Sequence, residues 1–285
     1  FRAGDTTFKV TFSCGLAAYP EVRRQLATRP FDLVMALQVY FKAGIVTAFT
    51  RSPIKLGFDR ARARDLNWLF TTHRIPPHPP QHVQDQYFEF LDAMGVPFGE
   101  PHWNLAPTTQ ERATAAALLN GRPRPVIGLV VGTSKPAKNW PAERYGELAL
   151  RLDKELGATV VLLGGNSPVE QAATATILGM ADRPVNALGS GIRGLVGLLA
   201  ACDVVVSPDT GPYHMCVAMN VPAVGLYGYT NPKRVGPYRR FQDLMIDGYG
   251  DPGEDYPISM EYRYNRMERI GVAEVFDKLR LALTK

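Results

Sequence analysis

Cysteines are few in this sequence of 285 residues, and long hydrophobic runs are absent from it. The three cysteines, Cys14, Cys202 and Cys216, are far apart, which excludes a disulfide framework and a cysteine-rich metal site and favours buried thiols in a reducing compartment. No apolar run reaches the roughly 18 residues that a membrane-spanning helix needs. A secretory signal peptide is not recognisable either, so we expect a cytoplasmic protein.

Several catalytic motifs are also missing. No G-x-G-x-x-G follows a predicted strand and no G-x-x-x-x-G-K-[ST] is present, so the sequence supports neither a nicotinamide or flavin fold nor a P-loop. The absence of G-x-S-x-G and H-E-x-x-H argues against a serine hydrolase and a zinc protease of those types. We expect no cofactor and no metal ion.

The composition is that of a globular protein with a slight excess of basic residues. Hydrophobic residues make up 46% and charged residues 21%, enough to bury sizeable cores, and the length suggests two domains. The formal charge is 32 − 27 = +5, which permits an anionic substrate or contact with a membrane surface but requires neither. We expect no nucleic-acid partner.

Short apolar runs alternate with amphipathic segments along most of the chain, which predicts an α/β protein whose parallel sheets carry helices on both faces. The predicted strands span 7–13, 31–37, 54–58, 126–131, 159–163, 186–188, 203–207 and 223–227. The predicted helices span 17–27, 40–49, 83–94, 108–120, 142–156, 168–178, 192–201, 212–219 and 272–283. The GRPRP segment at 121–125 is typical of a hinge, so we place the domains at 1–120 and 121–262, followed by a C-terminal segment at 263–285.

In the second half, the predicted strands end in loops rich in Gly, Ser, Thr, Asp and Lys. Three of these loops are 132–141, 164–167 and 208–211. Ligands of open α/β sheets bind at the carboxyl ends of the strands, so we expect these loops to line one crevice. A Lys/Thr/Ser loop, a Gly-Gly loop and an Asp-Thr-Gly helix start suit a nucleotide with a diphosphate.

The turn that precedes the helix at 212–219 has the features of an anion site. Asp209 or Thr210 can cap the helix, and Gly211 allows a ligand to approach the backbone. Free N–H groups and the helix dipole then favour a phosphate, with His214 on the same face of the first turn. The alternative is a well-capped helix on which His214 is a packed or surface residue.

A basic segment, 57–82, separates the regular parts of the first half. Its four prolines forbid a continuous helix, which predicts a long loop. The arginines Arg60, Arg62 and Arg64 could form a cradle for an anionic acceptor, because guanidinium groups suit phosphates and carboxylates. The alternative is a solvated charged surface.

Several motifs along the chain form a recognisable set. They are FDLVMALQ (31–38), IKLGFDR (54–60), GTSKPAKNWPAERYGELA (132–149), VVLLGG (160–165), SPDTGPYHMCVAMNVPAVGLYGYTNP (207–232) and VGPY (235–238). The most specific feature is the pair K-x-W-P and D-T-G-x-x-H at the separation found here. With these motifs the chain resembles glycosyltransferase family 9, the ADP-heptose:lipopolysaccharide heptosyltransferases.

This resemblance implies a GT-B architecture, with two Rossmann-like domains that face each other across a cleft. The first domain would bind the acceptor and the second the nucleotide sugar, while the C-terminal helix would pack back toward the first domain. The implied activity is metal-independent transfer of heptose from ADP-heptose to the inner core of lipopolysaccharide, with inversion at the anomeric carbon. The acceptor would be an anionic glycolipid, reached by peripheral contact with the inner face of the bacterial inner membrane.

The resemblance also implies roles for single residues. Thr133, Ser134 and Lys138 would hold the diphosphate together with the backbone of Thr210 and Gly211. Glu170 would meet the ribose, although an acidic residue in a first helical turn also has a structural explanation. His214 would steady a phosphate or the sugar, and Asp209 would cap the helix or bind sugar hydroxyls. The donor-binding set is Thr133, Ser134, Lys138, Glu170, Asp209, Thr210, Gly211 and His214.

The resemblance implies a catalytic base that this sequence does not supply at a matching position. In the family, the base is an Asp in the first strand-to-helix turn. Here Asp5 is followed by a predicted strand instead of a helix, and the chain begins at Phe1. We therefore expect the base in a segment that precedes residue 1. The alternatives are a GT-B enzyme with another nucleotide sugar and acceptor, or a non-catalytic protein that binds a nucleotide sugar.

Overall fold

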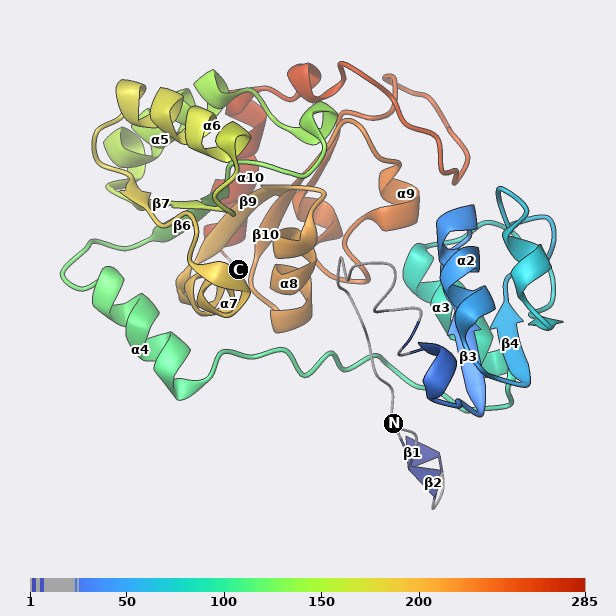
Figure 1. The fold of residues 1–285 in the computed structure, drawn as a ribbon. Coiled ribbons are helices and arrows are strands. Elements are labelled where there is room, and N and C mark those ends of the chain that lie inside the picture. The colour runs from blue at the N-terminus through green and yellow to red at the C-terminus, as the bar shows by residue number, and fades with distance from the viewer. Residues whose placement is uncertain (1, 4–5, 8–23, 25, 285) are drawn as a thin grey trace. The chain divides into compact units, whose positions relative to one another are not determined.

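The computed structural model describes residues 2–3, 6–7, 24 and 26–284. Outside these residues lie all but the first residue of the strand expected at 7–13, most of the helix expected at 17–27, Asp5 and Cys14. The chain divides into two compact units, Phe1–Pro101 and His102–Lys285. Each unit contains a parallel β-sheet, which confirms the predicted α/β class (Figure 1). Two short strands, β1 (Arg2–Ala3) and β2 (Thr6–Thr7), form a separate antiparallel pair.

The first unit holds a three-stranded parallel sheet in the order β3-β4-β5. The strands of this sheet are β3 (Leu33–Ala36), β4 (Ile54–Gly57) and β5 (His73–Arg74). The helical elements of the unit include α2 (Phe41–Phe49), the 3-10 turn η1 (Asn67–Phe70) and α3 (Val83–Ala93). Leu56, Phe58, Ile75 and Phe90 form its buried core. The basic segment at 57–82 is thus not a simple loop, because it contributes η1 and the third strand.

The second unit has the strand order of a Rossmann fold. Its six parallel strands follow the order β11-β10-β9-β6-β7-β8, which is 6-5-4-1-2-3 when counted within the unit. The strands are β6 (Val126–Val130), β7 (Thr159–Leu163), β8 (Val185–Asn186), β9 (Val204–Pro208), β10 (Ala223–Tyr227) and β11 (Met245–Asp247). Strands β7 and β8 are added on one side of β6, and strands β9, β10 and β11 on its other side, so the strand order reverses between β6 and β9. Folds of this kind bind ligands at that point.

Helices cover both faces of this sheet, because its central strands are apolar on both sides. On β6, Ile127 and Leu129 belong to one core cluster, while Val126 and Val130 belong to the other. Figure 1 shows α7 and α8 in front of the sheet and α10 behind it. The helices of the first face are α5 (Ala142–Leu156), α6 (Pro168–Met180) and α10 (Val272–Leu283), and those of the second are α4 (Thr109–Leu118), α7 (Gly191–Ala201) and α8 (Gly211–Met219).

The boundary between the units lies about twenty residues before the predicted hinge at 121–125. Helix α4 belongs to the second unit because it packs on α7. Glu111 on α4 forms an ion pair of 2.6 Å with Arg193 on α7, and Ala115 is buried in the core. The GRPRP segment therefore marks a loop between α4 and β6, so the expected boundary at residue 121 moves to 101/102.

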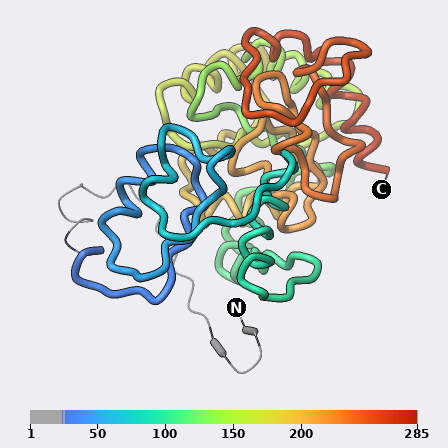
Figure 2. The backbone as a smooth tube through the Cα atoms, turned by 90° about the vertical axis from the view of Figure 1, so that its right-hand side faces the viewer, coloured from blue at the N-terminus to red at the C-terminus, as the bar shows by residue number. Residues whose placement is uncertain are grey.

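The segment at 228–271 contains more structure than the sequence predicted. Besides β11, it holds the short helix α9 (Pro232–Val235) and the 3-10 turns η3 (Gln242–Leu244) and η4 (Met267–Arg269). Figure 2 shows this orange-to-red part of the tube gathered on one side of the second unit.

Helix α10 follows and buries its apolar face in that unit, so its expected contact with the first domain stays a prediction. Within the described ranges, every helix is too short or too polar to cross a bilayer.

Candidate functional site

The loops that follow β6 and β9 meet at the point where the strand order reverses. Lys138 lies in the β6 loop, and Asp209 is the first residue after β9. Lys138 Nζ donates to Asp209 Oδ2 over 2.6 Å and to the Asp209 carbonyl over 3.1 Å. An ammonium group has three donors, so one N–H remains for a ligand. The predicted diphosphate loop and helix start are therefore joined by a direct ion pair.

The β6 loop is held at both ends by its own residues. At its start, Thr133 Oγ1 donates to the Lys135 carbonyl over 2.7 Å and accepts from the Lys135 N–H over 3.2 Å. At its end, Trp140 is buried in the core and donates from Nε1 to the Ile270 carbonyl over 2.9 Å. The 3-10 turn η2 (Pro136–Lys138) lies between these anchors, and Ser134 is exposed. This arrangement explains why Trp and Lys occur at fixed spacing in the K-x-W-P motif.

Asp209 is a buried carboxylate with compensating partners. It is 8% exposed, and its Oδ1 accepts from His214 Nε2 over 3.1 Å, while Thr230 donates to Oδ2 over 2.7 Å. Burial alone would raise the pKa of the carboxyl, but the hydrogen bond with His214 and the charge of Lys138 outweigh it and lower the pKa to about 2. Asp209 therefore stays ionised. Its two oxygens accept from the side chains of Lys138, His214 and Thr230, and the N-cap residue of α8 is Thr210, so the predicted role of Asp209 as the helix cap was wrong.

The start of α8 presents backbone donors beside this cluster. Thr210 is the N-cap residue, yet no side-chain hydrogen bond caps the helix, and its Oγ1 is buried without a partner among the described residues. The first N–H groups of a helix have no partner within the helix, and together with the dipole they attract anions. A Cβ added at Gly211 would meet nothing within 4 Å, so the approach to the helix start is open. His214, one turn further, is half exposed and lies on the same side as Asp209.

Glu170 has a structural role in the second unit. It forms a capping box with Ser167 at the start of α6, and its Oε1 accepts from the Gly165 N–H over 2.7 Å. Burial opposes ionisation, but the hydrogen bonds from Ser167 and Gly165 hold the pKa of the carboxyl below its usual value. Its bonds therefore fix the Gly-Gly loop after β7, and contact with a ribose stays a prediction.

Sequence reasoning did not assign a role to Thr230, which completes the cluster. It lies three residues beyond Tyr227, where β10 ends. Strand β10 pairs with β9, and the side chain of Thr230 is buried. The sequence could have indicated Thr230 by its position, because it lies in a polar loop after β10, at the same edge of the sheet as the loops after β6 and β9.

The three predicted acceptor arginines in the first unit differ in their surroundings. Arg62 is largely buried and forms ion pairs with Asp59 and, over 2.5 Å, with Glu89. Arg60 is exposed, with its guanidinium carbon 4.2 Å from the centre of the Trp68 ring. Arg64 is also exposed. Arg62 therefore fixes the segment, while Arg60 and Arg64 can reach a ligand.

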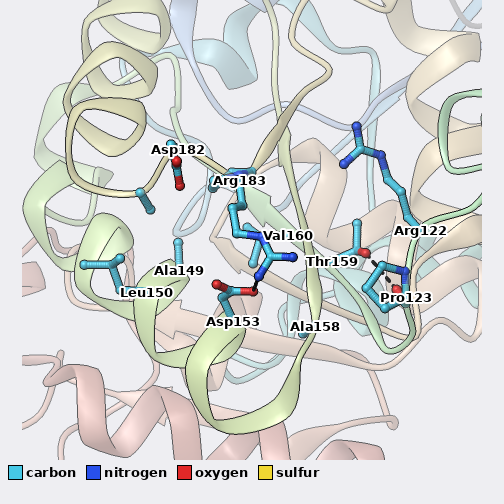
Figure 3. A pocket seen from close by; sticks show the side chains of 12 residues that line it. Arg122, Pro123, Ala149, Leu150, Asp153, Ala158, Thr159, Val160, Asp182 and Arg183 are labelled. Carbon is cyan, nitrogen blue, oxygen red and sulfur yellow. Dashed lines mark hydrogen bonds and ion pairs between the residues drawn. The ribbon is translucent and has the colours of Figure 1, made fainter.

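Two cavities lie at opposite ends of the strands in the second unit. One of about 340 Å³ lies beside the Gly-Gly loop and is lined by Asn166, Gln171, Thr174, Asn186 and Leu188, among others. The other, of about 60 Å³, lies at the amino ends of the strands, where Arg183 pairs with Asp153 (Figure 3).

In the described ranges no three His, Cys, Asp or Glu side chains are grouped so that they could hold a metal ion.

Comparison with known proteins identifies the family. The profile of glycosyltransferase family 9 (heptosyltransferase) matches residues 20–250. The chain is 27% identical to lipopolysaccharide core heptosyltransferase OpsX of Haemophilus influenzae, over 90% of this chain and 76% of that protein. It is 28% identical to lipopolysaccharide heptosyltransferase 1 of Pseudomonas aeruginosa, over 83% of this chain and 63% of that protein, so it spans less than two thirds of that relative.

Solved structures agree with this match. A glycosyl transferase family 9 structure from Veillonella parvula has a TM-score of 0.72 at 22% identity and covers 92% of this chain and 76% of that one. The structure of E. coli ADP-heptose lps heptosyltransferase II has a TM-score of 0.70 at 24% identity, with coverages of 93% and 81%. These likenesses confirm the predicted GT-B class with two Rossmann-like domains. Because the family profile matches most of the chain, the protein belongs to glycosyltransferase family 9, the heptosyltransferases.

Proposed function

We propose that the protein transfers heptose from ADP-heptose to the inner core of lipopolysaccharide. The observation that carries this proposal is the pairing of Lys138 with Asp209 beside the open start of α8, at the switch point of a Rossmann sheet. A lysine N–H and free backbone donors at one point suit a diphosphate. The relatives named above are heptosyltransferases, and the solved WaaC structures of E. coli contain ADP and ADP-2-deoxy-2-fluoro heptose.

The order of the strands suggests how the donor lies along the sheet edge. The cavity beside Asn166 and the loop held by Glu170 lie at β7 and β8, and we place the nucleoside there. The diphosphate then lies between β6 and β9, at Lys138 and the start of α8. The sugar extends to the side of β10, where Thr230 and Asp209 offer polar atoms.

The transfer itself is an inverting displacement. An acceptor oxygen attacks the anomeric carbon and forms the new C–O bond, while the bond from that carbon to the diphosphate oxygen breaks and ADP leaves with both electrons. The acceptor hydroxyl proton passes to a general base, which we do not assign to a residue of this chain. Lys138 and the backbone N–H groups of Thr210 and Gly211 stabilise the charge that develops on the leaving diphosphate. Because Asp209 is already paired, it does not repel the diphosphate as a bare carboxylate would.

For the acceptor, the exposed arginines Arg60 and Arg64 are the candidates in the first unit. Their guanidinium groups suit the phosphates and carboxylates of lipid A that carries Kdo sugars. Arg62 acts indirectly, through its ion pairs with Asp59 and Glu89. An Arg60→Ala variant should therefore lose acceptor affinity without loss of stability, whereas Arg62→Ala should lower stability first, as a thermal melt would reveal.

The same unit presents apolar side chains that suit peripheral contact with an anionic membrane on the cytoplasmic side. Phe41, Leu66 and Leu69 are all exposed, and α2 packs on η1, so these side chains come from neighbouring elements. Basic and apolar groups together favour binding to anionic bilayers. Sedimentation with vesicles should show binding that requires anionic lipid and weakens with salt and in Leu69→Glu. Equal binding to neutral vesicles would contradict this.

The test of the proposed function is a transfer assay with the full-length protein. ADP-heptose and Kdo-bearing lipid A are incubated with the enzyme, and mass spectrometry of the lipid should reveal addition of one heptose. Lys138→Ala should abolish most of the product, while Lys154→Ala on the exposed end of α5 should not. Transfer from a UDP- or GDP-sugar instead would favour the alternative donor, and binding without any transfer would favour a non-catalytic protein.

A further inference from the structure

Three tyrosines and a lysine form a cluster beside the donor site. The rings of Tyr229 and Tyr262 stack with centroids 4.7 Å apart, and Tyr264 meets Tyr229 edge-on at 5.3 Å. The Lys135 ammonium lies 4.6 Å from the centre of the Tyr262 ring. Tyr229 is buried, but Tyr262 is 41% exposed and Tyr264 63% exposed. The cluster thus offers aromatic surface and a cation to solvent.

The backbone around these rings is fixed by several interactions. Thr230 pairs with Tyr262 in a β-bridge, and the Arg263 N–H donates to the Tyr229 carbonyl over 3.0 Å. The Arg263 side chain forms two hydrogen bonds of 2.6 Å with the Glu254 carboxylate. A bidentate pair of this kind fixes both the distance and the relative orientation of the guanidinium and carboxylate groups. The exposed rings therefore stand on a framework that is ordered before any ligand arrives.

Two segments of the chain connect the cluster with the polar site. Thr230, next to Tyr229 in the chain, donates to the Asp209 carboxylate over 2.7 Å. Lys135 stands three residues before Lys138 in the same loop, and Lys138 donates to the same carboxylate oxygen of Asp209 as Thr230 does. The tyrosines therefore lie on the β10 side of the site, where the proposed donor orientation places the sugar.

Exposed tyrosines next to a transferase site match the chemistry of a sugar. One face of a pyranose ring carries C–H groups that pack on an aromatic ring, while its hydroxyls need polar neighbours. Lys135 adds a donor for hydroxyls or for a carboxylate. We infer that Tyr262, Tyr264 and Lys135 form a sugar-ring subsite, which binds either the sugar of the donor or the acceptor sugar that receives it. This inference rests on the proposed function.

The test separates nucleotide binding from sugar binding in the full-length protein. Calorimetry compares ADP with ADP-heptose, and steady-state transfer assays give KM for ADP-heptose and for Kdo-bearing lipid A. The variants are Tyr264→Ala, Tyr262→Ala and Lys135→Ala, with Tyr264→Phe as the conservative variant. Leu150→Ala is the matched control, because this exposed side chain of α5 lies by the cavity at the opposite ends of the strands (Figure 3).

We expect Tyr264→Ala to raise one KM about five- to tenfold and to leave ADP affinity unchanged, with Tyr264→Phe close to wild type. An increase in KM for ADP-heptose assigns the subsite to the donor sugar, and an increase for the lipid assigns it to the acceptor. If wild type transfers heptose and the tyrosine variants match Leu150→Ala in both KM values, the inference is overturned while the proposed function stands. A wild-type protein that binds no nucleotide sugar overturns both.

Discussion

Asp209 combines two properties that oppose each other in most proteins, namely burial and negative charge. A buried carboxylate is tolerated only when charge and hydrogen bonds compensate for lost hydration. Here Lys138, His214 and Thr230 provide that compensation from three different segments. The carboxylate in turn orients the ammonium group of Lys138 toward the start of α8. A single buried acid thus positions the cation that the proposed chemistry needs.

The pH dependence of stability should report this buried acid. The folded-state pKa of Asp209 is about 2, below its ordinary value of 3.8, so its ionised form stabilises the native state above about pH 4. That contribution, about 2 kcal/mol, should be lost as the pH falls through about 2. In urea unfolding between pH 2 and pH 6, the free energy of unfolding should therefore fall more steeply with decreasing pH in wild type than in Asp209→Asn. Equal slopes in the two proteins would contradict the assignment.

The single residues of the site were only partly predictable from the sequence. The D-T-G-x-x-H motif identifies Asp209 and His214, and K-x-W-P identifies Lys138, because the spacing of each motif follows from one turn and one helix. The contact between Lys138 and Asp209 spans 71 positions and depends on strand order, which no local pattern reveals. The burial of Arg62 could not be predicted either, because Arg62 lies in a turn and its partner Glu89 lies on α3, 27 positions later.

Among the elements, α4 and α7 approach each other closely because α7 has a glycine, Gly197, at the point of contact. A Cβ at Gly197 on α7 would lie 2.7 Å from the backbone oxygen of Glu111 on α4. Only glycine permits that approach, which also brings Arg193 to the Glu111 carboxylate. The contact explains why α4 belongs to the second unit although it precedes the expected hinge.

Gly197→Ala should lower the free energy of unfolding by about 1–3 kcal/mol, because the added methyl group forces two backbones apart. Gly179→Ala is the matched control, since a Cβ at this helical glycine of α6 would meet nothing within 4 Å. The control should be neutral or stabilising by up to about 1 kcal/mol. Chemical denaturation of both variants measures the difference. A Gly197→Ala protein as stable as the control would show that α4 is not tightly docked.

Long elements were predicted well and very short ones were not. The helix at 142–156 and the strand at 159–163 match the structure at both ends, because the helix has a regular apolar periodicity and the strand is a nearly continuous apolar run. Strands β5 and β11 have two and three residues, and only hydrogen bonds to a neighbouring strand define them. Such strands carry too few residues to form a pattern.

For the molecule as a whole, the two units differ in how much core they enclose. The second unit has one apolar cluster on each face of six strands, whereas the described residues of the first unit form one small cluster on three strands. We therefore expect the fragment 102–285 to unfold cooperatively by itself. The fragment 121–285 lacks α4 and should be less stable by on the order of 2–4 kcal/mol, because the face of α7 is then exposed. Chemical denaturation of both fragments tests this expectation. Equal free energies of unfolding would support a domain boundary at residue 121 instead of 101/102.

The most direct measurement of the central claim is calorimetric binding of ADP, UDP and GDP to the full-length protein. We expect ADP to bind best, Lys138→Ala to weaken ADP binding at least about tenfold, and Lys154→Ala to bind ADP like wild type. Circular dichroism shows whether each variant is folded. If a folded wild-type protein binds no nucleotide, or if folded Lys138→Ala binds ADP as tightly as wild type, the assignment of the diphosphate to the loops after β6 and β9 is wrong.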